Sequence, residues 1–193
     1  MEAEKMWDQL IPEEAVLLFR TDNRLSLSRV SDLPEIALLD DITPGNVQNV
    51  QIIEQQTLSS TQPTRFQIEA LFLYPVNASD LETVWVTSAP ENYGEYLSGL
   101  FRKSFKESRY EYMKSPVYIL YLDDLNTVYA IQVGKQMYFS ESSLALEKVL
   151  RTARGLDPAM RLERPPSPGE LLVNTPHLYR WLQQVGRVIH HPA

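Results

Sequence analysis

Three pairs of neighbouring carboxylates are the side chains whose types and spacing could support hydrolysis. Glycoside hydrolysis uses two carboxyl groups about 5 to 9.5 Å apart, one as an acid and the other as a base or nucleophile. Each pair here lies in a segment predicted to be a turn, so we expect its members to be solvated rather than catalytic. A hydrolase that acts on a polymer through these turn carboxylates is the alternative function. The pairs are Glu13-Glu14, Asp40-Asp41 and Asp123-Asp124.

The three histidines, His177, His190 and His191, form no catalytic or metal-binding pattern. The sequence has no Gly-x-Ser-x-Gly elbow to pair a nucleophile with His177, and no two histidines have the i, i+4 spacing of a helical metal site. Its seven glycines do not form a phosphate-binding loop, and it has no cysteine for thiolate chemistry. We therefore expect that the chain is not an enzyme and that it binds no cofactor and no metal.

A basic stripe is the first candidate for an interaction surface. Arg102, Lys106 and Arg109 recur at i, i+4 and i+7 on a helix predicted to begin at residue 90. Opposite them lie apolar residues, which is the layout of a helix attracted to an anionic surface. Glutamates are interspersed at 95, 107 and 111, so an ordinary solvated face is the interpretation we favour.

Tyrosines on the central predicted strands are the second candidate. Strand side chains alternate between the two faces of a sheet, so six tyrosines cannot all face one core. An exposed group around Tyr110 and Tyr112 would offer an aromatic platform to a glycan or a peptide, whereas cross-strand packing is the default. The six are Tyr110, Tyr112, Tyr118, Tyr121, Tyr129 and Tyr138.

Composition narrows the class of protein and of partner. The chain has 193 residues, enough to bury a full core, and its 44% hydrophobic and 22% charged residues are typical of a globular protein. The net charge of -7 gives no general attraction to phosphate backbones, so we expect no nucleic-acid partner. The apolar stretches are shorter than the roughly 20 residues needed to cross a bilayer. We therefore expect no membrane span.

The stretch from 116 to 154 has the clearest structural pattern. Residues 117–122, 128–133 and 136–139 are apolar, β-branched or aromatic runs, which predicts a three-stranded meander. Gly134 lies where a tight hairpin needs a positive φ. Serines then precede a helix whose apolar residues share one face, as i, i+3, i+4 and i+7 spacing requires. These are Leu146, Val149, Leu150 and Ala153.

The pattern as a whole predicts an α+β fold: a largely antiparallel β-sheet with helices packed mainly on one face. Further strands are expected at 15–19, 50–57, 65–74, 83–87 and 170–174, and further helices at 22–33, 90–105 and 176–185. The predicted core includes Trp85, Phe101, Ile119, Leu146, Val149 and Leu150.

Three regions are expected along the chain. Residues 1–155 form an α+β core domain, and 156–169, with four prolines, form an extended connector. Residues 170–193 have the same strand, cap and helix order as the beginning of the chain, so we interpret them as the start of a second unit, either packed on the first or cut from a larger protein. Coincidence is the alternative, because this order is common.

The last predicted helix has an apolar stripe, formed by Leu178, Trp181, Leu182 and Val185, that must be buried against something. We expect this helix to end near Gly186. If the stripe stays exposed it marks an interaction surface, with Trp181 as its candidate residue. Its partner would be a second copy or the remaining part of the protein's own full-length chain.

Three segments carry a resemblance to a known family: IPEEAVLLFRTDN, YFSESSLALEKVLR and GELLVNTPHLYRWL. The chain resembles an uncharacterised family of cell-envelope proteins from Bacteroidota, in which a signal-bearing α+β region precedes a propeller-like β region. The resemblance implies a periplasmic or outer-membrane-associated location, with the signal removed from the sequence given. It transfers no functional residues.

Together these observations predict a non-catalytic cell-envelope module, a binding or scaffolding domain of a larger extracytoplasmic protein. Its partner would be a protein or a glycan. Besides the hydrolase, a cytosolic adaptor is an alternative function. A signal upstream in the full gene would argue against the adaptor.

Overall fold

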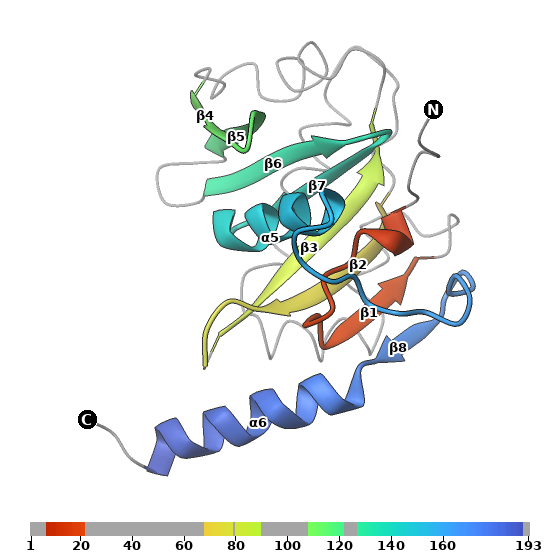
Figure 1. Cartoon of the computed structure of the whole chain (residues 1–193), viewed down its shortest axis with the longest axis vertical. Helices are drawn as coiled ribbons and strands as arrows, with labels where there is room; N and C mark the ends of the chain where they lie inside the picture. The colour runs from red at the N-terminus through yellow and green to blue at the C-terminus, as the bar shows by residue number, and fades with distance from the viewer. Residues whose placement is uncertain (1–6, 22–67, 79, 90–107, 122–126, 191–193) are drawn as a thin grey trace.

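The chain folds around one eight-stranded antiparallel sheet, in the order β4-β5-β6-β7-β3-β2-β1-β8 (Figure 1). The structure, a computed structural model, describes residues 7–21, 68–78, 80–89, 108–121 and 127–190, with the side chains of 187–190 left out. The α+β class with a largely antiparallel sheet is thereby confirmed. The described elements are η1 (Trp7–Gln9), β1 (Leu17–Arg20), β2 (Ile68–Pro75), β3 (Leu81–Ser88), β4 (Ser108–Tyr112), β5 (Ser115–Tyr121), β6 (Thr127–Val133), β7 (Gln136–Ser140), α5 (Ser143–Ala153), β8 (Leu171–Val173) and α6 (Thr175–His190).

The predicted meander is confirmed as β5, β6 and β7, and β4 extends it by one strand. Gly134 has φ 59° in the β6–β7 hairpin, as its position in the sequence indicates. Between β4 and β5 the chain turns at Met113 and Lys114, with φ 51° and 60°. Two successive positive φ values give the turn twist that suits a two-residue hairpin. In this turn, residues other than glycine occupy the two positions with positive φ.

Helix α5 covers one face of the sheet. The Ser142 side chain caps its first turn by accepting a hydrogen bond from the Ala145 amide, 3.4 Å away. The helix contacts β6, β7 and β3. Its apolar face joins buried strand residues in one cluster, which from the strands contains Leu18, Ala70, Phe72, Val84, Val86, Val117, Ile131 and Tyr138.

The opposite face of the sheet is buried as well. Alternation along paired strands places Trp85 on this second face, while Val84 and Val86 face α5. No helix among the described residues has side chains assigned to a cluster on this face. Its buried residues are Phe19, Leu71, Leu73, Trp85, Leu120, Val128, Ala130, Met137 and Phe139.

The predicted core is confirmed for Trp85, Leu146, Val149 and Leu150, each at most 5% exposed. It is wrong for Ile119, which is only half-buried. Ile119 lies on β5, next to the edge strand β4 and beyond the three strands on which α5 mainly packs. Phe101 lies outside the described residues, as do the helices predicted at 22–33 and 90–105 and the strand predicted at 50–57.

The connector after α5 runs back across the N-terminal segment. Pro12 and Ala159 form an isolated antiparallel bridge, and the Met160 amide donates to the Ile11 carbonyl over 2.8 Å. Met160 and Leu162 pack against the core cluster. The chain then enters β8, which pairs with β1. The strand predicted to start a second unit is therefore the last strand of the same sheet.

A carboxylate fixes the connector to α5. Asp157 accepts a two-pronged hydrogen bond from Arg151, at 2.7 and 3.0 Å, and Lys148 Nζ lies 3.0 Å from it. These contacts hold the pKa of Asp157 down to about 2, with the Arg151 hydrogen bonds as the largest cause. Lys148 also lies 2.7 Å from Glu14, so the network reaches the N-terminal segment.

Candidate functional site

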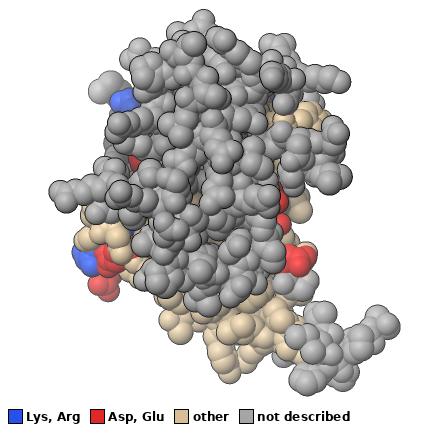
Figure 2. All heavy atoms as spheres, turned by 180° about the vertical axis from the view of Figure 1, so that it is seen from behind, with Lys and Arg blue, Asp and Glu red and all other residues tan. Residues whose placement is uncertain are grey.

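Exposed apolar side chains gather at the C-terminal end of the described chain. The large apolar side chains exposed among the described residues number seven, and four of them lie on β8 and α6. We call these four the C-terminal apolar surface: Leu171, Val173, Tyr179 and Leu182, between 41% and 62% exposed. In the rear view the described atoms at the lower end of the molecule, where Figure 1 places α6, are uncharged (Figure 2). The other three, Tyr121, Leu144 and Leu156, are separated along the chain.

The predicted stripe on the last helix is only partly exposed. Leu178, Trp181 and Val185 are half-buried, whereas Leu182 is 51% exposed. The Trp181 indole nitrogen is buried without a hydrogen-bond partner among the described residues. A buried N–H group without a hydrogen bond costs about 1 to 3 kcal/mol of stability, so this position of the indole nitrogen is unfavourable.

Helix α6 also continues through Gly186 to His190, so the predicted end of this helix is wrong. A glycine inside a helix costs only about 1 kcal/mol relative to alanine. The helix therefore extends well beyond the edge of the sheet (Figure 1).

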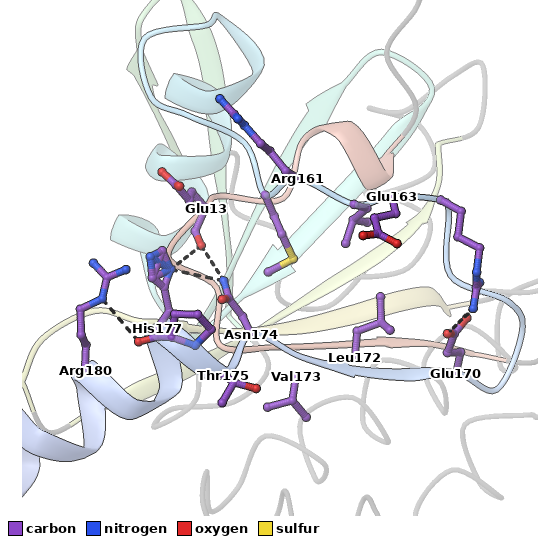
Figure 3. Close-up of a pocket in the computed structure, with 14 residues that line it drawn as sticks. Glu13, Arg161, Glu163, Glu170, Leu172, Val173, Asn174, Thr175, His177 and Arg180 are labelled. Carbon is purple, nitrogen blue, oxygen red and sulfur yellow. Dashed lines mark hydrogen bonds and ion pairs between the residues drawn. The ribbon is translucent and has the colours of Figure 1, made fainter.

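An open pocket with a volume of about 660 Å³ lies between β8, the start of α6 and the connector (Figure 3). Leu172, Met160 and Leu162 give it apolar walls, and charged side chains lie around them. The charged and polar lining residues are Glu13, Arg161, Glu163, Arg164, Glu170, Asn174, Thr175, His177 and Arg180.

Asn174 and His177 attach the start of α6 to the N-terminal segment. The Asn174 amide donates to the carbonyl oxygens of Glu13 and Ala15, both at 2.9 Å. His177 Nδ1 lies 2.7 Å from the same Glu13 oxygen. A carbonyl oxygen only accepts, so Nδ1 carries the proton in this contact. His177 is thus a half-buried structural residue rather than a surface one.

Both ends of β8 carry charged side chains of either sign. At the Glu170 end, Arg164 forms two hydrogen bonds to Glu170, at 2.7 and 2.8 Å, and these lower the pKa of Glu170 to about 2. At the same end Glu163 adds one negative charge, and Arg20, whose guanidinium donates to the Pro166 carbonyl over 2.6 Å, adds one positive charge. At the α6 end, the side chain of exposed Arg180 lies 3.4 Å from the Pro176 carbonyl. Figure 3 shows Glu163 and Glu170 at one end of β8 and His177 and Arg180 at the other.

Of the basic and aromatic candidates, the structure describes Arg109, Tyr110 and Tyr112 on β4 and Trp181 on α6. Arg102 and Lys106 lie outside the described residues, and Arg109 is exposed on strand β4 rather than on a helix. The helical spacing fails there because Ser108–Tyr112 pairs with β5 as a strand. Tyr110 and Tyr112 are half-buried against the core cluster. The Tyr110 hydroxyl donates to Glu147 on α5 over 2.7 Å, so these rings pack under the helix rather than forming an open platform.

Of the three acidic pairs, the structure describes Glu13-Glu14. Glu14 is ion-paired with Lys148. Asp40-Asp41 and Asp123-Asp124 lie outside the described residues. Within the described ranges no group of three His, Asp or Glu side chains could hold a metal ion.

Sequence reasoning missed Leu171, Val173 and Tyr179. The sequence predicts a strand over 170–174. The three apolar residues in it do not indicate that two of them face solvent. A signal is available in the strand's position, because it directly follows a proline-rich connector.

No family model, curated protein or solved structure matches this chain. The resemblance to the cell-envelope family therefore stays a prediction. None of the helices in the described part of the chain is long and apolar enough to cross a membrane.

Proposed function

We propose that this chain is a non-catalytic binding or scaffolding module of a larger cell-envelope protein, and that it binds a partner protein through the C-terminal apolar surface. One observation carries the proposal: four of the seven exposed large apolar side chains of the described residues lie on β8 and α6. Exposed apolar side chains gathered in this way mark an interaction site. The periplasmic or outer-membrane-associated location and the Bacteroidota family belong to the same proposal and come from the sequence resemblance.

A protein partner suits this surface better than a glycan. Glycan platforms need aromatic rings with open faces, and Tyr110 and Tyr112 are packed under α5. The C-terminal surface contains one aromatic residue, Tyr179, beside three aliphatic ones, and aliphatic side chains pack against protein. Helices packed mainly on one face of the sheet would fit this function. Helix α5 covers the face opposite to Leu171 and Val173. Strand β8 and helix α6 are then available to a partner at the edge of the sheet.

Photo-crosslinking in the native cell tests this function. A crosslinking amino acid at Tyr179 should give one discrete adduct that fractionates with the cell envelope, and Leu182→Asp should abolish it. The matched control places the same amino acid at Leu144, which is 61% exposed on α5 and is not part of the proposed surface. Equal adducts at both positions, an adduct insensitive to Leu182→Asp, or no adduct at Tyr179 would refute the proposed surface.

The non-catalytic part of the proposal has its own test. The purified chain should show no turnover in a broad hydrolase screen. Turnover that disappears when one of the acidic pairs is changed to amides would establish the hydrolase instead.

A further inference from the structure

Oxygen-bearing side chains gather on the α5 face of the sheet, where η1 packs on the core cluster. Gln136 and Tyr138 lie two residues apart on β7, so they point to the same face, and Tyr138 belongs to that cluster. Ser88 is the register partner of Gln136, and its hydroxyl donates to Glu69 on β2. Asp8 lies on η1. We call these side chains the oxygen cluster: Asp8, Glu69, Ser88, Gln136 and Tyr138.

Three oxygen atoms of this cluster are buried without a hydrogen-bond partner among the described residues. They are Asp8 Oδ1, Gln136 Oε1 and the hydroxyl oxygen of Tyr138. Tyr138 as a whole is fully buried. Buried polar atoms in folded proteins nearly all have a partner, from the protein, from ordered water or from a bound ion. Three such atoms in one cluster therefore indicate that a bound species supplies the contacts they lack.

The charges that act on the Tyr138 hydroxyl are negative. Burial is the largest cause of its raised pKa, and the carboxylates of Glu69 and Asp8 raise this pKa further. Both carboxylates are half-buried, and neither is ion-paired within the described part of the chain. Arg20, on the same face of β1, donates to the Pro166 carbonyl over 2.6 Å. A water molecule could bond to the buried oxygens, but only a cation also offsets the two negative charges.

We propose that the oxygen cluster binds one calcium ion. Asp8 Oδ1 and Gln136 Oε1 are its ligands, with Glu69 as the second carboxylate. The Tyr138 hydroxyl contributes a neutral oxygen. The inference goes beyond the proposed function and does not involve the C-terminal apolar surface.

The types of ligand select calcium among the common metal ions. Ca²⁺ takes about six to eight oxygen ligands in a flexible geometry, from carboxylates, amide carbonyls and water. Mg²⁺ requires a near-octahedral arrangement, which is harder to build from side chains on η1, β2 and β7. The cluster contains no nitrogen or sulfur ligand, which argues against zinc.

The number of carboxylates sets the expected affinity. Two ligands are charged and the others are neutral oxygens, and calcium affinity falls as the number of charged ligands falls. We therefore expect a dissociation constant of about 0.1 to 1 mM, the range of extracellular calcium modules. Because residues 8, 69, 136 and 138 are far apart in the sequence or on one strand, no spacing motif marks this site.

Thermal unfolding of the purified chain tests the site. Protein freed of metal with a chelator is titrated with CaCl₂ to about 10 mM at constant ionic strength. At calcium tenfold above the dissociation constant, the Tm should rise by about 3 to 6 °C. MgCl₂ at the same concentration should give a smaller rise. Isothermal titration calorimetry should give one calcium ion per chain.

A charge variant tests the assigned ligand. Asp8→Asn keeps the shape of the side chain and removes one of the two negative charges, so it should weaken calcium binding at least about tenfold. Glu111→Gln provides the matched control, because Glu111 is an exposed carboxylate on β4 outside the cluster. It should bind calcium as the unmodified chain does.

A hydroxyl variant separates calcium binding from a purely structural role. Tyr138→Phe keeps the ring in the core and removes a hydroxyl that has no partner among the described residues. Without calcium its Tm should stay the same or rise, whereas the rise caused by calcium should shrink. Tyr121→Phe, at a tyrosine that is 39% exposed, should change neither value.

Three results overturn the calcium site: no rise in Tm up to about 10 mM CaCl₂, an equal rise with MgCl₂, or a rise that Asp8→Asn retains in full. The three buried oxygens would then be bonded to water. If Asp8→Asn does not fold, Tyr138→Phe decides. A calcium-dependent rise as large as that of the unmodified chain overturns the site in that case.

Discussion

The Asn174 side chain donates a 2.9 Å hydrogen bond to the Glu13 carbonyl oxygen, joining residues 161 positions apart in the sequence. The second amide hydrogen serves the Ala15 carbonyl, also at 2.9 Å, and Ala15 is fully buried. One side chain thus fixes the junction of β8 and α6 to the segment that leads into β1.

Asn174→Ala should destabilise the chain by about 1 to 3 kcal/mol, because it removes the Asn174 donor from the carbonyl oxygen of buried Ala15. Urea unfolding at constant pH measures this as a lower midpoint. Gln183→Ala provides the control, since Gln183 is an exposed amide on α6. An unchanged midpoint for Asn174→Ala would show that water replaces the amide at no cost.

Leu150→Ala should cost about 2 to 5 kcal/mol, because Leu150 is 3% exposed and its truncation leaves a cavity between α5 and the sheet. Thermal unfolding gives the measurement. Leu144→Ala removes the same atoms from the same helix at a position that is 61% exposed, and we expect little change there. Similar losses for the two variants would contradict the assigned helix face.

Stability should fall in acid as Asp157 is protonated. Its pKa is lowered from 3.8 to about 2, chiefly by hydrogen bonds from Arg151. A lowered carboxyl pKa gives stability that is present above the unfolded pKa, near 4, and lost as the pH falls through about 2. In urea unfolding between pH 5 and 2, the difference between the unmodified chain and Asp157→Asn should therefore shrink. A difference that stays constant across this range would show that the ion pair adds nothing to stability. Glu170 titrates in the same range, but it is present in both proteins, so its contribution cancels in the difference.

The sequence by itself determined the elements whose signals are local. The meander follows from β-branched and aromatic runs separated by Asp123–Asn126 and Gly134, and α5 follows from its serine cap and its apolar spacing. Gly134 needs a positive φ, which is a property of one residue and its turn. Leu146, Val149 and Leu150 could be assigned to the core because helical periodicity alone places them on one face.

Helix α6 shows where local signals mislead. The glycine at 186 suggested a stop, but a glycine is only a weak breaker, and the helix continues to His190. Arg109 has the spacing of a helical stripe with Arg102 and Lys106, yet pairing between β4 and β5 makes it part of a strand.

Only the tertiary structure decided which strands distant in the sequence are neighbours. The sheet places β7 beside β3 and β8 beside β1, and the strands in each of these pairs lie far apart in the sequence. Strand pairing depends on hydrogen bonds and packing between distant segments, which no local pattern encodes. The three apolar residues from Leu171 to Val173 would be buried in a central strand. They are partly exposed here because β8 is the last strand of the sheet.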